Sequence, residues 1–173
     1  TASWTRLIPG SYTVTEPGVS GDWTVQSSGP GIVPINGGTG SATVTNTRKL
    51  GGLDVTKTVN WNGVTPDQNQ TFEICITGPS YPTTPNCKTV GYNGGMASWT
   101  GLLPGSYTVT ETNPGSVWSV AITGSPAVVS ATGAPAAANV TNTYVLGELQ
   151  VTKVVNWKGI TPDTNKTFEI CIQ

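Results

Sequence analysis

The chain has 173 residues, of which only 10% are charged, and its eight basic and nine acidic residues give a net charge of -1. This balance lacks the basic patch of a nucleic-acid-binding protein, and no apolar run reaches the ~18 residues of a transmembrane helix, so we expect neither nucleic acid nor membrane insertion. Histidine is absent, which excludes Ser-His-Asp and Cys-His catalysis and most zinc sites, so we expect no turnover enzyme, metal or cofactor.

Short runs of alternating Thr, Val and aromatic residues, separated by Gly, Pro and Asn clusters, follow one another along the whole sequence. β-branched and aromatic residues favour strands, whereas Gly, Pro and Asn favour the turns between them. No stretch keeps an apolar period of about 3.6 residues over three helical turns. The sequence therefore predicts an all-β sandwich, immunoglobulin-like in broad architecture.

The sequence also repeats itself. The run Pro-Gly-Ser-Tyr-Thr-Val-Thr-Glu at residues 9–16 returns at 104–111, and the run Val-Thr-Lys at 55–57 returns at 151–153. The offset is about 96 residues, the size of a small β-domain. We therefore expect three units, which are the C-terminal half of a repeat (1–47), a complete repeat (53–143) and the N-terminal half of a following repeat (148–173).

Each of the two half-repeats would expose apolar faces and unpaired strand edges. Two interpretations remain open: the sequence is a window of a longer array, or each half is completed by a neighbouring chain. In the second case copies of the chain are its partners, and head-to-tail pairing gives an open filament. A unit formed by joining residues 148–173 to residues 1–47 would lack a counterpart of residues 77–96 of the complete repeat. The short linkers, 48–52 and 144–147, are expected to join consecutive copies stiffly.

Three polar residues of the complete repeat fall on strand faces that are otherwise apolar. Alternate residues of a strand share a face, and the three faces are Leu53-Val55-Lys57-Val59-Trp61, Tyr107-Val109-Glu111 and Ala138-Val140-Asn142-Tyr144. Burial of an unpaired charge costs several kcal/mol and burial of an unpaired amide costs about 1–3 kcal/mol, so these residues need a reason to be there.

The simpler interpretation is a buried Lys-Glu ion pair that Asn142 helps to satisfy. The alternative is chemical. Desolvation lowers the pKa of a buried lysine and raises that of a buried carboxyl, so both can be neutral. A neutral amine is a nucleophile, and a protonated carboxyl polarises a carboxamide. Attack of Lys57 on Asn142, with Glu111 moving the protons, would expel ammonia and leave an isopeptide bond after a single turnover.

The order Val-Thr-Lys-x-Val, then Pro-Gly-Ser-Tyr-Thr-Val-Thr-Glu, then Val-Thr-Asn-Thr resembles the Cna-B-type (prealbumin-like) domains of bacterial surface adhesins and pili. The resemblance covers nearly the whole chain and implies tandem β-sandwich repeats. It implies that Lys57 and Asn142 are joined and that Glu111 is the assisting acid. By the same resemblance Lys153 is the amine of the next copy, while Glu16 and Asn46 are the acid and amide of the preceding one.

The three cysteines suggest an oxidising, extracellular setting. Cys75 points away from the expected inward face of its strand, and a disulfide with Cys87, twelve residues later, is plausible; two free thiols are the alternative. Cys171 occupies the position of Cys75, and no counterpart of Cys87 follows it.

The predicted function is structural. We expect a subunit of an extracellular or cell-surface filament or stalk, stabilised by autocatalytic Lys-Asn isopeptide bonds. The alternative is an adhesin or ligand-binding surface module in which the repeats act as spacers.

Overall fold

The computed structural model describes residues 1–173, and every regular element in it is a strand, which confirms the all-β prediction. No helix is long and apolar enough to cross a membrane. The strands are β1 (Gly10–Tyr12), β2 (Trp23–Ser27), β3 (Gly31–Val33), β4 (Val44–Arg48), β5 (Gly51–Asn60), β6 (Thr71–Gly78), β7 (Tyr81–Gly91), β8 (Gly95–Leu102), β9 (Gly105–Glu111), β10 (Trp118–Thr123), β11 (Ala127–Val129) and β12 (Ala136–Tyr144).

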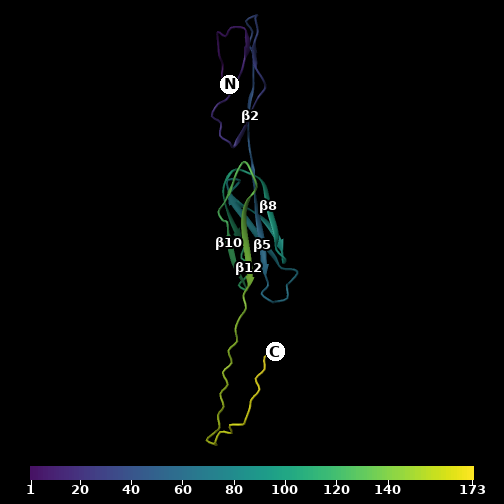
Figure 1. The fold of residues 1–173 in the computed structure, drawn as a ribbon, viewed down its shortest axis with the longest axis vertical. Helices are drawn as coiled ribbons and strands as arrows, with labels where there is room; N and C mark the ends of the chain where they lie inside the picture. The colour runs from purple at the N-terminus through teal and green to yellow at the C-terminus, as the bar shows by residue number, and fades with distance from the viewer.

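The middle of the chain forms two four-stranded sheets in a sandwich-like arrangement (Figure 1). One sheet has the order β10-β12-β5-β8, and the other has the order β11-β9-β6-β7. All neighbours are antiparallel except β12 and β5, which run parallel and lie at the centre of the first sheet. This parallel pair brings residues that are distant in sequence, such as Lys57 and Val140, into register.

Both sheets contribute apolar side chains to one core. The core has 14 buried residues, and its largest fully buried members include Leu53, Ile74, Leu102 and Tyr107. These side chains come from alternate positions of their strands, as the sequence pattern predicts. The core therefore sits between the sheets, and any polar residue on an inward face must find its partner there.

The connection into β5 is shorter than the sequence suggested. Gly51 and Gly52 belong to β5 instead of the expected 48–52 linker, and Tyr144 likewise ends β12. Position 51 of the strand requires glycine, because the Cβ of any other residue would collide with the carbonyl oxygen of Ser130. Only Lys49 and Leu50 separate β4 from β5, so the joint is short.

The two ends of the chain lie beyond opposite ends of the central sandwich (Figure 1). At the N-terminal end, β1 pairs with β3 and β2 pairs with β4, in two separate two-stranded sheets. At the C-terminal end, residues 148–173 form turns but no strand, and nearly all of their side chains are exposed.

Candidate functional site

Lys57 lies on the inward face of β5 and is almost completely buried, as the alternation predicts. Its Nζ lies 2.6 Å from Oε1 of Glu111, and the side chains of the two residues are 0% and 1% exposed. Glu111 reaches Lys57 from the facing sheet, because it ends β9, which pairs with β6. The ion pair therefore spans the sandwich core.

Asn142 completes the cluster from β12. It is 0% exposed and lies diagonally across from Lys57 on the adjacent strand, since Lys57 is in register with Val140 and Asn142 with Val59. Neither the Nδ2 nor the Oδ1 of Asn142 has a hydrogen-bond partner, and the same is true of Oε2 of Glu111. A buried polar group without a partner costs about 1–3 kcal/mol, so the carboxamide is destabilised where it stands.

The environment makes Lys57 a better nucleophile than an ordinary lysine. Removal from water lowers the pKa of Lys57 from its ordinary value of 10.5, and the hydrogen bond and charge of Glu111 offset this shift only in part. A lowered pKa increases the fraction of neutral amine at a given pH. The ion-paired amine and carboxyl group thus share one buried core with a carboxamide that lies at the diagonal position of the neighbouring strand, and proximity in a water-excluded site favours amide exchange.

A cluster of aromatic rings closes the site, and sequence reasoning did not assemble it. Lys57 Nζ lies 4.4 Å from the centroid of the Phe72 ring, and Trp118 packs edge-on against Phe72 at 5.2 Å. Trp61 and Tyr144 pack on Trp118 in turn. The signal was present, because Trp61 follows Lys57 and Tyr144 follows Asn142 on the same strand faces. These rings exclude water from the charged groups.

The N-terminal part of the chain also brings an acid and an amide together, Glu16 and Asn46, but without a lysine and with a direct hydrogen bond between them. Asn46 Nδ2 donates a hydrogen bond of 3.1 Å to Oε1 of Glu16, and both residues are exposed. Beside them is an open hollow of about 260 Å³, which Trp23 also lines. Asn46 faces Val25 across the β2–β4 pair as Asn142 faces Val120 across the β10–β12 pair.

Lys153 is exposed and belongs to the C-terminal segment. This segment extends from the end of the central sandwich opposite the N-terminal part (Figure 1). Its Nζ lies 4.3 Å from the centroid of the Phe168 ring, as that of Lys57 does from Phe72 at 4.4 Å. The six residues singled out from the sequence therefore form one complete cluster, one acid–amide pair and one isolated amine.

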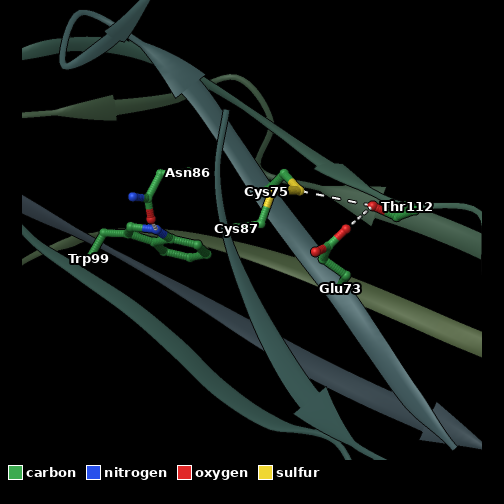
Figure 2. The surroundings of a disulfide bond; sticks show 6 residues. All are labelled: Glu73, Cys75, Asn86, Cys87, Trp99 and Thr112. Atoms are coloured by element: carbon green, nitrogen blue, oxygen red, sulfur yellow. Dashed lines mark hydrogen bonds between the residues drawn. A yellow bond between two sulfur atoms is a disulfide. The ribbon is translucent and has the colours of Figure 1, made fainter. Parts of the chain in front are cut away.

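Cys75 and Cys87 form a disulfide between directly opposed positions of β6 and β7 (Figure 2). Cys75 points away from the core, as expected, but neighbouring side chains cover it and it is only 7% exposed. Thr112 lies over it and donates a hydrogen bond of 2.6 Å to Glu73 (Figure 2). Cys171 is an exposed free thiol.

The ligand atoms of Glu73, Cys75 and Cys87 lie within 4.8 Å of one another, a spacing that a metal ion accepts. Cysteine binds a metal as the thiolate, however, and both sulfurs are already joined in the disulfide. They therefore offer no thiolate ligand. The group is therefore better described as a covered disulfide than as a metal centre.

Loss of the disulfide is expected to destabilise the sandwich measurably. The bond closes a loop of 12 residues, for which the expected contribution is about 3 kcal/mol or less. Thermal melting with and without a reductant measures it. The Cys75→Ser/Cys87→Ser variant should melt below the unaltered chain and be insensitive to reductant, whereas Cys171→Ser should melt as the unaltered chain does. A melting temperature unaffected by reduction of the unaltered chain would contradict this.

The sequence matches the model of the family described as Domain of unknown function (DUF5979) over residues 53–145, more than half of the chain, and the chain therefore belongs to that family. No curated protein matches it.

Among solved structures, the chain is similar to a bacterial adhesin from Mobiluncus mulieris that contains intramolecular disulfide, isopeptide and ester cross-links, with 14% identity and a TM-score of 0.44 over 74% of this chain and 56% of the adhesin chain. It is also similar to the major pilin T-13 of Streptococcus pyogenes, with 15% identity, a TM-score of 0.32, and coverage of 82% and 68% of the two chains. A further major pilin of Streptococcus pyogenes gives 17% identity and a TM-score of 0.27, with coverage of 80% and 65%. These similarities are too low to carry a functional argument.

Proposed function

We propose that the chain is a structural part of a bacterial-type surface stalk or filament, made of β-sandwich repeats at 1–47, 53–143 and 148–173. In the complete repeat, an isopeptide bond joins Lys57 Nζ to Asn142 Cγ and forms without another enzyme. The disulfide supports an extracellular location, because such bonds persist in oxidising compartments.

The observation that carries this proposal is the buried carboxamide of Asn142. It has no hydrogen-bond partner at either polar atom, although it is buried in the same core as the Lys57–Glu111 pair and diagonal to Lys57 on the neighbouring strand. As a resting polar network this cluster is poorly satisfied. The proposed reaction would remove this cost in part, because the bond consumes the amine and releases the unpaired NH₂ group as ammonia.

The reaction needs only the groups present. Transfer of a proton along the 2.6 Å hydrogen bond from Lys57 to Glu111 gives a neutral amine and a neutral acid. The amine lone pair attacks Cγ of Asn142, and Glu111 donates a proton to the carboxamide and later accepts one from the attacking nitrogen. The new C–N bond replaces the old one and ammonia leaves. Glu111, having donated one proton and accepted one, is still the neutral acid formed in the first step, and it returns to the carboxylate when that proton departs with ammonia as ammonium.

The bond would clamp the two central strands of one sheet, which run parallel and start far apart in the sequence. A force that pulls the chain ends apart must then break a covalent bond before β5 and β12 separate. Such a role suits a stalk that bears load, and it requires no ligand and only a single turnover.

A mass comparison tests the proposal. We expect the reduced, denatured chain to contain a branched peptide in which Lys57 and Asn142 are linked with loss of one ammonia. The Asn142→Ala chain should lack that peptide. Detection of unlinked Lys57 and Asn142 peptides in the folded, unaltered chain would reject the reaction and leave a buried polar cluster.

The unlinked site is expected to respond to alkaline pH. In the Asn142→Ala chain the amine of Lys57 stays free, and its lowered pKa means that the unfolded state binds more protons than the folded state between that pKa and about 10.5. The free energy of unfolding should therefore rise with pH in this window. Denaturant unfolding at several pH values measures the slope, and the Lys57→Met/Asn142→Ala chain is the matched control. Equal slopes in the two chains would contradict the burial argument.

A further inference from the structure

The Cys75–Cys87 disulfide has one covered end and one open end. Cys75 lies on β6, which has β7 on one side and β9 on the other, and it is 7% exposed. Cys87 lies on β7, which forms the edge of this sheet, and it is exposed. Thr112 follows β9 and places its Oγ1 4.0 Å from Sγ of Cys75 (Figure 2). The disulfide is therefore covered at Cys75 and open at Cys87.

This asymmetry selects the sulfur that a free thiol attacks. In thiol–disulfide exchange a thiolate approaches one sulfur and expels the other, so the rate depends on which sulfur is accessible. A thiolate that attacks Cys75 in line with the S–S bond has to come from the side of β9 and Thr112, whereas one that attacks Cys87 comes from the open edge of the sheet. Attack at Cys87 is therefore favoured, with Cys75 as the leaving sulfur.

The expelled sulfur of Cys75 stays in place to reverse the reaction. Cys75 and Cys87 are directly opposed in the β6–β7 register, so the free thiol of one remains beside a mixed disulfide on the other. Such proximity gives the intramolecular attack a large advantage over attack by a second molecule of thiol. Cys75 thus has the geometry of a resolving thiol, and the disulfide re-forms when the external thiol is removed.

One negative charge lies beside the disulfide. A carboxylate oxygen of Glu73 lies within 4.8 Å of both sulfurs, and Glu73 is exposed on the outward face of β6. The other charged residues of β6, β7, β9 and β11 are Lys88 and Glu111, and both are in register with the inward-facing Ile74. A thiol that approaches Cys87 therefore meets the carboxylate of Glu73 and no compensating cation on this face of the four strands.

We propose that the Cys75–Cys87 bond is a site of reversible exchange with small thiols, which attack at Cys87, and that the Glu73 carboxylate selects amino thiols over thiols that carry a carboxylate. The ammonium group of an amino thiol complements the charge of Glu73, whereas a second carboxylate is repelled. Two unit charges about 5 Å apart in water change a rate by about fourfold, so thiols that differ by two charges should differ by about 5- to 15-fold at low salt.

The exchange balances with the thiol as the only co-reactant. The thiolate attacks Sγ of Cys87, the S–S bond breaks, and its electron pair leaves on Sγ of Cys75, which takes up the proton that the thiol released. Attack of Cys75 on the mixed disulfide reverses both changes. Attack of a second thiol on the small-molecule half of the mixed disulfide instead gives two free cysteines and an oxidised small disulfide. The protein then gains the two electrons that the two thiols lose.

Opening of the bond loosens β7 and no other strand, because β7 pairs only with β6. β7 covers Trp99 of β8, which is 3% exposed. Asn86 accepts a 2.7 Å hydrogen bond from Trp99 Nε1, and Lys88 Nζ lies 5.5 Å from the centroid of the ring (Figure 2). The fluorescence of Trp99 should therefore report the opening. None of the three residues of the proposed isopeptide site lies on β7, so this inference is independent of the proposed function.

The point of attack is tested with the Cys171→Ser chain, which lacks the exposed free thiol. After a short treatment with cysteamine, free thiols are blocked with iodoacetamide and the peptides are mapped by mass. We expect the cysteamine adduct on Cys87 and the blocking group on Cys75. An adduct mainly on Cys75, or equally on both, would overturn the assignment.

Two chains with a single cysteine test the same assignment without a short-lived intermediate. The Cys75→Ser/Cys171→Ser chain keeps Cys87, and the Cys87→Ser/Cys171→Ser chain keeps Cys75. With cystamine, the disulfide of cysteamine, the chain that keeps Cys87 should form its adduct at least about tenfold faster, because its sulfur is the accessible one. Both chains lose the same disulfide, so any loss of stability is shared. Equal rates would contradict the asymmetry.

The charge selectivity is tested by reducing the disulfide with cysteamine and with thioglycolate at low salt, followed by Trp99 fluorescence and by mass. The ratio of the two rates should fall by about 5- to 15-fold in the Glu73→Gln/Cys171→Ser chain relative to Cys171→Ser, since the intrinsic reactivities of the thiols cancel in this comparison. Asp54→Asn/Cys171→Ser is the matched control, because Asp54 lies on the other sheet and its loss should leave the ratio unchanged. An unchanged ratio in the Glu73→Gln chain would overturn the selectivity, and a disulfide that neither thiol opens would overturn the exchange itself.

Discussion

The Glu111→Gln chain is expected to fold and yet to keep Lys57 and Asn142 unlinked. Glutamine has nearly the shape of glutamate and can still accept a hydrogen bond from Lys57, but it cannot take up and return a proton at neutral pH. Removal of a positioned proton-transfer group typically slows a reaction by about 10²–10⁴-fold, so the branched peptide should be absent or form very slowly. Peptide mass mapping after timed refolding measures this.

A matched control uses another carboxylate of the same sandwich. Glu73 lies on β6 and accepts a hydrogen bond from Thr112 away from the core, so Glu73→Gln should link as fast as the unaltered chain. If Glu111→Gln links at the rate of Glu73→Gln, the role assigned to Glu111 is wrong.

Loss of the cross-link is expected to cause the largest change in stability. The proposed bond would close a loop from residue 57 to residue 142, and a cross-link of that span contributes about 4.5 kcal/mol by restricting the unfolded chain. Since 1 kcal/mol shifts the melting temperature of a domain of this size by about 4–8 °C, Asn142→Ala should melt roughly 20 °C or more below the unaltered chain.

Lys57→Met should be less stable still, because it prevents the proposed bond and also leaves the buried carboxyl of Glu111 without its cation. Loss of one partner of a buried ion pair typically costs about 3–5 kcal/mol. The Lys57→Met/Glu111→Gln chain should recover part of this loss, since it buries no unpaired charge. Calorimetry of the four chains gives the order, and a melting temperature for Asn142→Ala within a few degrees of the unaltered chain would contradict a cross-linked core.

The burial of Lys57, Glu111 and Asn142 could be predicted from the sequence, because strand alternation assigns each residue to a face. Lys57 falls on the face of Leu53 and Val55, and Asn142 falls on that of Ala138 and Val140; all of these are buried. Alternation is local, so it needs only the chain itself. The same reasoning places Glu111 inward.

The strands and side chains that these faces contact could not be predicted, because alternation carries no information on strand pairing. The parallel contact of β5 with β12, and the approach of Glu111 from the other sheet, depend on how the whole chain crosses between sheets. The aromatic cover over Lys57 depends on the same crossing, since Trp118 arrives from the edge strand β10. Only the positions of Trp61 and Tyr144, on the same strand faces as Lys57 and Asn142, indicated it.

The covering of Cys75 was also beyond local reasoning. Its outward orientation follows from the positions of Ile74 and Ile76, but its low exposure results from the disulfide and from Thr112, which follows a strand of the same sheet. A side chain on an outward face is exposed only if no neighbouring strand or loop lies over it.

The measurement that tests the central claim most directly is peptide mass mapping of the unaltered chain after reduction and denaturation. The account predicts a single branched peptide that joins Lys57 to Asn142 and is one ammonia lighter than the sum of its two parts. Two separate peptides of unaltered mass would contradict it, and would reduce Lys57, Glu111 and Asn142 to an unreactive buried ion pair with an unsatisfied amide beside it.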